Sequence, residues 1–187
     1  MLRYVWDPFI RIFHWSLVGA FAYAFYTHAS IWDQLHHTYA GYVAGTLIIA
    51  RIVWGLIATG YANFQSFPLN PIWAAKYFWR LLHGTAKHYV GHNPIGSIAI
   101  YAMLALGILA VGSGCVTYND GWGFIDSEMS ETLHAYVTWI WLAVVCVHVF
   151  GVIFESIIHH DNLIWAMITG CKRVCKIDER QARKKIR

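Results

Sequence analysis

The sequence alternates long apolar segments with shorter polar ones. Four of the apolar segments are long enough to cross a hydrocarbon core of about 30 Å as α-helices. They cover residues of about 8–30, 35–58, 94–114 and 130–158. The first and third open with a helix cap and a proline at the first helical position, Asp7-Pro8 and Asn93-Pro94. This pattern predicts an all-α fold, an integral membrane four-helix bundle.

The connection between the second and third spans, residues 59–93, has a different pattern. Trp73, Tyr77 and Leu81 recur there at helical spacing, with Lys76 and Arg80 between them. A helix with one apolar side and one basic side lies along a membrane surface and does not cross it. We therefore expect an interfacial amphipathic helix over residues 71–83.

The composition also indicates a membrane protein. Of the 187 residues, 58% are hydrophobic, 17% aromatic and only 13% charged. No CxxCH motif occurs, which excludes covalent attachment of a c-type haem, and Cys171 with Cys175 alone would make a poor metal cage. Because a four-cysteine iron–sulfur set and a nucleotide fingerprint are both missing, we expect primary substrate chemistry on another chain and no nucleic-acid partner.

Charge is distributed unevenly along the chain. The loops after the first and third spans contain no Lys or Arg, but they contain several acids. These acids are Asp33, Asp120, Asp126, Glu128 and Glu131. By the positive-inside rule, both termini of this multi-pass protein are expected in the cytoplasm. Residues 1–170 then form a four-span domain, and residues 171–187 form a basic cytoplasmic tail.

Four histidines fall at two matched depths in this topology. His134 and His148 are fourteen residues apart in the fourth span, so they face the same side of a helix about 21 Å apart. His14 lies at the cytoplasmic depth of His148, and His37 lies at the outer depth of His134. A buried imidazole in a bundle is costly unless its nitrogens are satisfied, and a haem iron satisfies one of them. We predict two haems, each between two histidines; the alternative is four boundary or core histidines bonded to neighbours.

Three further residues are candidates for haem contact. Gly41 and Gly45, one turn apart in the second span, would let a flat porphyrin approach or would serve close helix packing. Arg51 is fourteen residues after His37 and should reach the inner haem. It would either neutralise a haem propionate or extend to the cytoplasmic surface.

The chain resembles the four-span di-haem cytochrome b subunits of nickel–iron hydrogenases and the related bacterial cytochrome b-561 proteins. The resemblance is carried by VWDPFIRIFHW at 5–15, LHHTYAGYVAG at 35–45, GHNPIG at 91–96, the His134/His148 pair and HDNL at 160–163. It implies two non-covalent b-type haems on His14, His37, His134 and His148, with His37 chosen from the His36-His37 doublet by family spacing. It also implies a bacterial inner membrane, a place in a respiratory chain, and electron exchange between a quinone pool and an outer redox partner. That partner would be a c-type cytochrome or a hydrogenase-like subunit.

The inner end of the fourth span predicts a quinone site. Glu155 lies nearly two turns beyond His148 on about the same face, and His159 follows one turn later. Ionisable groups there would exchange protons with a quinone. The alternative is that they mark the membrane boundary, with Glu155 paired to an arginine. As a whole, the chain is predicted to be an electron-transfer subunit, at most a quinone oxidoreductase by itself. A different class of function is a histidine-lined transporter or metal-handling membrane protein without haem.

Overall fold

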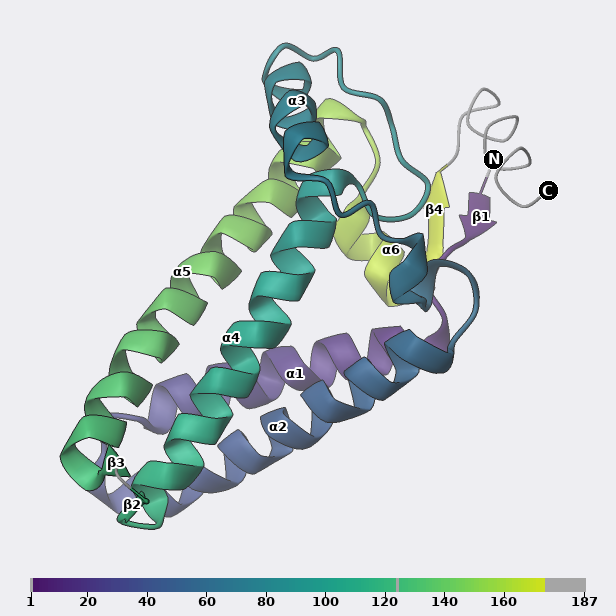
Figure 1. Ribbon diagram of the computed structural model, residues 1–187. Helices are drawn as coiled ribbons and strands as arrows, with labels where there is room; N and C mark the ends of the chain where they lie inside the picture. Colours follow the sequence, from purple (N-terminus) through teal and green to yellow (C-terminus); the bar gives the residue numbers. More distant parts are fainter. Residues whose placement is uncertain (1, 124, 174–187) are drawn as a thin grey trace. The chain divides into compact units, whose positions relative to one another are not determined.

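The computed structural model describes residues 2–123 and 125–173, and this part of the chain is mostly helical (Figure 1). Its α-helices are α1 Pro8–Thr27, α2 Gln34–Ile57, α3 Pro71–Leu82, α4 Pro94–Tyr118, α5 Ser127–Ile158 and α6 Leu163–Thr169. Short 3₁₀ turns occur at Ile31–Asp33, Gly60–Ala62 and Phe64–Ser66. The prediction of a helical membrane protein is confirmed.

The predicted helix starts are explained by their caps. Asp7 Oδ1 accepts a hydrogen bond from Ile10 N at 2.9 Å, and Asn93 Oδ1 accepts one from Gly96 N at 2.7 Å. Asn70 accepts from the backbone amides of the second and third residues of α3. These side chains satisfy amide groups that the first turn of a helix leaves without a partner. The expected amphipathic helix after residue 70 is present as α3.

The structure revises the predicted span boundaries. Among the described residues, α2, α4 and α5 are long and apolar enough to cross a membrane. Helix α4 continues to Tyr118 and α5 begins at Ser127, so both are longer than the sequence suggested, while α1 ends at Thr27. Helix α1 has 20 residues, including Arg11 and His14, and it is not among the helices that are long and apolar enough to cross a membrane. A fourth span therefore stays a prediction.

Two small antiparallel sheets were not predicted. Strand β1 (Leu2–Tyr4) pairs with β4 (Cys171–Arg173), and β2 (Gly121–Trp122) pairs with β3 (Ile125–Asp126). Gly170 turns the chain into β4 with φ of 83°, and a Cβ there would lie only 2.9 Å from the carbonyl oxygen of Trp6. Cys171 thus lies in a strand. Cys175 and the rest of the predicted basic tail after residue 173 lie outside the described residues.

The chain divides into two units, each described separately. The described residues of the first unit come from Met1–Arg11, Trp54–Ile100 and Val147–Arg187, and they form a core of Val5, Trp6, Val90 and Ala166. The second unit comprises Ile12–Val53 and Tyr101–Cys146. In the second unit, the rings of Phe21 and Trp141 meet edge to face with centroids 4.8 Å apart. The one-domain organisation predicted for residues 1–170 stays a prediction.

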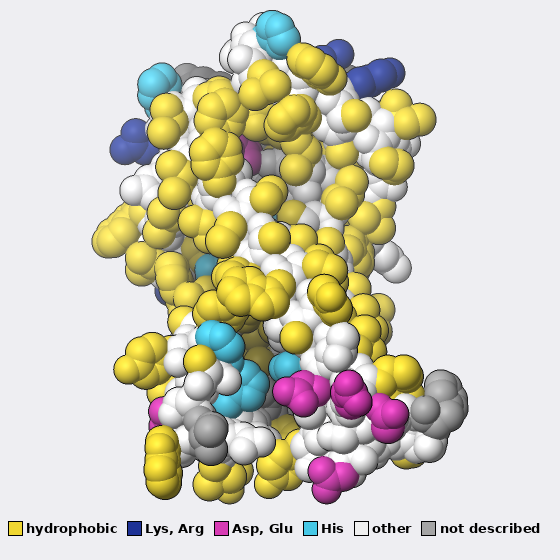
Figure 2. Space-filling view, turned by 90° about the vertical axis from the view of Figure 1, so that its left-hand side faces the viewer, with side chains coloured by type: hydrophobic (Ala, Val, Ile, Leu, Met, Phe, Trp, Pro, Cys, Tyr) yellow, Lys and Arg dark blue, Asp and Glu magenta, His cyan; other side chains and the backbone are white. Residues whose placement is uncertain are grey.

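Large hydrophobic side chains cover much of the visible surface (Figure 2). Ile49 on α2, Leu109 on α4 and Val147 on α5 are among the many that are exposed. A soluble protein rarely exposes so much contiguous apolar surface, whereas a membrane protein presents it to lipid.

Candidate functional site

The second unit brings together the outer histidine pair. His37, in the first turn of α2, and His134, in α5, have ring centroids 6.0 Å apart and ring planes nearly perpendicular at 89°. They are 97 positions apart in the chain, so only the packing of α2 and α5 places them together. The predicted outer pair is therefore also a pair in space.

Each ring of this pair has one nitrogen fixed by a backbone carbonyl. His37 Nδ1 lies 2.8 Å from Ala24 O, and His134 Nδ1 lies 2.9 Å from Ala110 O. Because a carbonyl oxygen only accepts, both Nδ1 atoms must donate, and both Nε2 atoms carry the free lone pair. Ser113 Oγ, 3.2 Å from His134 Nδ1, supports the same orientation. Histidines that ligate metals are oriented in this way, with the second nitrogen donating to a carbonyl.

The distance between the rings suits a shared metal ion. A metal–imidazole bond of about 2 Å puts the centroids of two imidazoles on opposite sides of one ion about 6 Å apart. The described residues contain no group of three or more His, Cys, Asp or Glu side chains able to hold a metal ion. Two imidazoles alone are too few ligands for a protein-bound zinc ion. They would be enough for a haem iron, because the porphyrin supplies the other ligands. The residues therefore fit haem.

Glycines shape the space beside this pair. A Cβ at Gly41 would meet nothing within 4 Å, whereas one at Gly45 would come within 2.8 Å of Val111 on α4. The Gly45 backbone therefore lies close to Val111, and the haem contact of both Gly41 and Gly45 stays a prediction. A Cβ at Gly114 would lie 3.1 Å from His134 Cε1, so the absence of a side chain there makes room for the imidazole.

The inner pair stays a prediction from sequence. His14 belongs to the second unit and His148 to the first, and both are half-buried. Arg51, on α2, is only 4% exposed and interacts electrostatically with Tyr101 of α4. A buried guanidinium in a membrane-spanning helix requires polar groups around it. The predicted pairing of Arg51 with a haem propionate also stays a prediction.

Glu155 lies in a buried polar environment within the first unit. It is 8% exposed and accepts hydrogen bonds from Tyr77 Oη at 3.4 Å and from Asn93 Nδ2. Burial first, and then Glu155, raises the pKa of the Tyr77 phenol far above its ordinary value, so Tyr77 stays a donor. The carboxylate is thus bound by α3 and by the cap of α4, where the sequence suggested an arginine.

His159 lies in the turn after α5, close to a second histidine. The rings of His88 and His159 have centroids 5.1 Å apart, and His88 Nε2 lies 3.7 Å from Asp161 Oδ2. Burial lowers the pKa of His159, as do His88 and Lys172, while Glu155 and Asp161 oppose the shift. His159 Nε2 is buried without a hydrogen-bond partner among the described residues.

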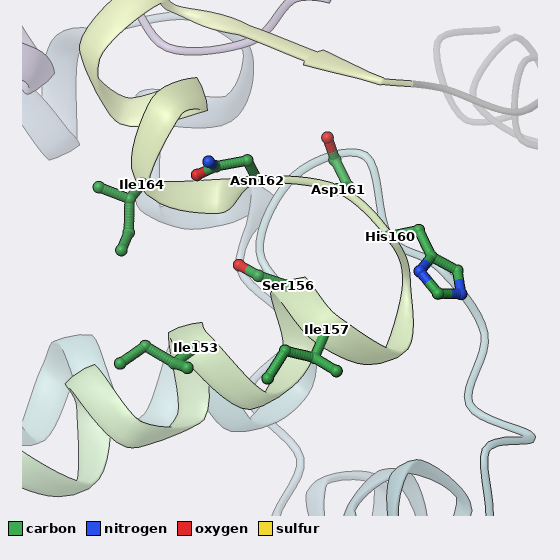
Figure 3. A pocket seen from close by; sticks show the side chains of 7 residues that line it. All are labelled: Ile153, Ser156, Ile157, His160, Asp161, Asn162 and Ile164. Carbon is green, nitrogen blue, oxygen red and sulfur yellow. The ribbon is translucent and has the colours of Figure 1, made fainter.

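A shallow surface pocket of about 360 Å³ lies at the end of α5, beside the turn that follows it (Figure 3). It is lined by Ile153, Ser156, Ile157, His160, Asp161, Asn162 and Ile164. Glu155 and His159, the residues predicted for a quinone site, do not line it. Its isoleucines offer apolar walls, and the turn at its edge offers polar groups.

The acidic side chains predicted for the outer loops are exposed or partly exposed in the second unit. Asp120, Asp126, Glu128 and Glu131 are exposed, and Asp33 pairs with His36 at 3.4 Å. Acidic side chains gather on one part of the face in Figure 2, with histidines beside them. This surface lies in the same unit as the His37/His134 pair.

Several residues of these sites were missed or undervalued in the sequence. Asn93 was recognised only as a helix cap, and Tyr77 only as an apolar position of the helix at residues 71–83. Ser113 and Gly114 carried no signal, because nothing in α4 alone shows which of its residues meets an imidazole of α5.

Comparison with known proteins gives one family. The model of prokaryotic cytochrome b561 matches residues 5–170. A protein of Rhizobium leguminosarum bv. viciae, named Probable Ni/Fe-hydrogenase B-type cytochrome subunit, is 26% identical over 89% of this chain and 87% of its own length. A protein of Azotobacter vinelandii with the same name is 23% identical over the same shares. Probable Ni/Fe-hydrogenase 1 B-type cytochrome subunit of Escherichia coli (strain K12) is 22% identical over 90% and 89%. No solved structure gives a significant match.

Proposed function

The chain belongs to the prokaryotic cytochrome b561 family, and on that premise we propose that it is a di-haem electron-transfer subunit. Membership makes it a membrane b-type cytochrome, a class that binds haem. The proposal adds that two haems carry electrons across the bilayer between a quinone pool and a redox partner at the outer surface. The observation that carries it is the His37/His134 pair, with both Nδ1 atoms bound to carbonyls and 6.0 Å between the rings.

In this proposal His37 and His134 hold the outer haem, and His14 and His148 hold the inner one. Haem supplies reversible one-electron transfer at its iron. The imidazoles of these residues would hold the iron, a ligand set that suits electron transfer better than oxygen chemistry. The carbonyls of Ala24 and Ala110 fix the imidazole orientation. The spacing of fourteen residues along α5 puts the two ligands about 21 Å apart, one toward each membrane surface.

The same proposal includes a membrane arrangement. Helices α1, α2, α4 and α5 form a four-span bundle in a bacterial inner membrane, with α3 in the interface and both termini in the cytoplasm. The support is the absence of Lys and Arg from the loops after the first and third spans. Electrons would then cross from the acidic outer surface to the cytoplasmic side, or in the reverse direction.

The outer partner is proposed to be a hydrogenase subunit or a c-type cytochrome. The names of the relatives support the first, since they read Probable Ni/Fe-hydrogenase B-type cytochrome subunit. The quinone is proposed to react at the cytoplasmic side near Glu155 and His159. Support for that place comes from two groups able to accept and return protons. Glu155 is buried and lies seven residues beyond His148 on α5, and His159 lies in the turn after α5, eleven residues beyond His148.

The test is a reduced-minus-oxidised spectrum of the purified chain, with haem quantified per polypeptide. Two low-spin b-type haems per chain are expected. A folded chain without such bands would refute the proposal and favour the histidine-lined transporter. For the quinone, Glu155→Gln and His159→Ala are tested separately, and haem reduction by a quinol analogue should slow in both. Unchanged rates with intact spectra would move the quinone site elsewhere.

A further inference from the structure

A chain of polar side chains runs through the first unit from its edge to Glu155. At the edge, the His88 side chain is 16% exposed and lies beside Asp161. The His88 ring contacts the His159 ring, and His159 interacts electrostatically with Glu155, one turn earlier in the sequence. These residues come from the connection before α4, from α5 and from the turn after it.

We infer that His88 and His159, oriented by Asp161, form a proton relay between the aqueous edge of the first unit and Glu155. The inference rests on the proposed quinone function. It adds His88 and Asp161 to the proposed site and names the side of the first unit from which protons reach Glu155. Neither His88 nor Asp161 is among the residues that the sequence predicted for the quinone site.

The chemistry of the proposed substrate requires such a path. Each quinone reduced to quinol takes up two electrons and two protons, and oxidation of a quinol releases the same numbers. Haem would exchange only electrons with the quinone, so the protons would have to come from, or return to, cytoplasmic water. Glu155 is only 8% exposed and accepts hydrogen bonds from Tyr77 and Asn93, so its direct contact with water is small.

The groups around His159 suit transfer. Its lowered pKa keeps the imidazole neutral at pH 7, with one nitrogen ready to accept a proton. Its Nε2 is buried without a hydrogen-bond partner in the described part of the chain, which is where one bridging water or a substrate oxygen would bind. Asp161 Oδ2 lies 3.7 Å from His88 Nε2 and so faces the His88 ring at the start of this chain of side chains. Lys172, whose Nζ donates to Tyr89 O at 2.7 Å, adds a fixed positive charge nearby.

The test uses the full-length haem-loaded protein and the water-soluble quinol duroquinol. Haem reduction is followed by stopped flow at pH 7, with proton release measured by a pH indicator. We expect His88→Gln to slow both signals by at least about tenfold, because general acid–base groups contribute on this scale or more. Added imidazole should restore most of the rate. Reduction by dithionite, which needs no proton path, should be unchanged.

The matched control is His83→Gln, five residues earlier in the same connection. His83 is exposed, and its Nδ1 donates a hydrogen bond to Trp79 O of its own helix turn, at 2.7 Å. This variant should keep the wild-type rate. Asp161→Asn provides a second disruption of the relay and decides the question if His88→Gln does not fold.

The outcomes separate the relay from the function it rests on. A wild-type rate in both His88→Gln and Asp161→Asn overturns the relay alone. Two other results also overturn the relay, because they assign these residues a structural role. One is slow reduction by duroquinol that added imidazole does not restore, and the other is reduction by dithionite that is slowed as well. A wild-type protein with two b-type haems but no reaction with duroquinol overturns the quinone function, and the relay with it.

Discussion

Replacing one member of the His36-His37 doublet should remove one haem, and replacing the other should remove none. His37 is oriented by Ala24 O and faces His134. The His36 side chain is 56% exposed and its Nδ1 lies 3.4 Å from Asp33 Oδ1. The two neighbours differ only in which side of α2 they occupy, because adjacent helical residues point about 100° apart.

The size of the effect follows from the number of sites. In the His37→Ala variant only His134 would remain to hold the outer haem, so that haem should be lost from the chain. The bis-histidine b-band amplitude per chain should therefore fall by about half. His36→Ala loses one exposed pair with Asp33, an interaction worth at most about 1 kcal/mol, and should keep the full amplitude.

The assay is haem content per polypeptide together with the reduced-minus-oxidised spectrum of each purified variant. Circular dichroism verifies that both variants are folded. Loss of a haem in His36→Ala, or a full complement in His37→Ala, would refute the assignment. Loss of both haems from a folded His37→Ala protein would refute the separation into two layers.

Further predictions concern the other sites. His148→Ala should remove the inner haem and leave the outer one, as read from the same spectra; retention of both haems would reject His148 as a ligand. Gly45→Leu should lower the unfolding temperature, because its Cβ would already come within 2.8 Å of Val111, and an unchanged temperature would argue against close packing there. Glu128→Gln with Glu131→Gln should weaken association with a cationic partner at low salt, in a stopped-flow assay. An association rate that does not respond to ionic strength would count against docking by charge.

The sequence by itself determined the local features of this protein. Apolar length and capping residues placed the helices to within a few positions, because helix formation depends on near neighbours and on burial from water. The spacing of His134 and His148 on one helix was equally readable, since it depends only on helical geometry. The distribution of Lys and Arg likewise predicts a topology without any tertiary information, and that topology stays a prediction.

Only the tertiary structure decided which residues meet. It brought the His37 ring within 6.0 Å of the His134 ring and supplied the carbonyls of Ala24 and Ala110 from other helices. It also bound Glu155 to Tyr77 and Asn93, 78 and 62 positions away in the chain. Periodicity shows which side of a helix is polar, but the partner of that side depends on how distant segments pack. No single segment of the sequence contains that information, because the energy of such a contact arises only when both segments are in place.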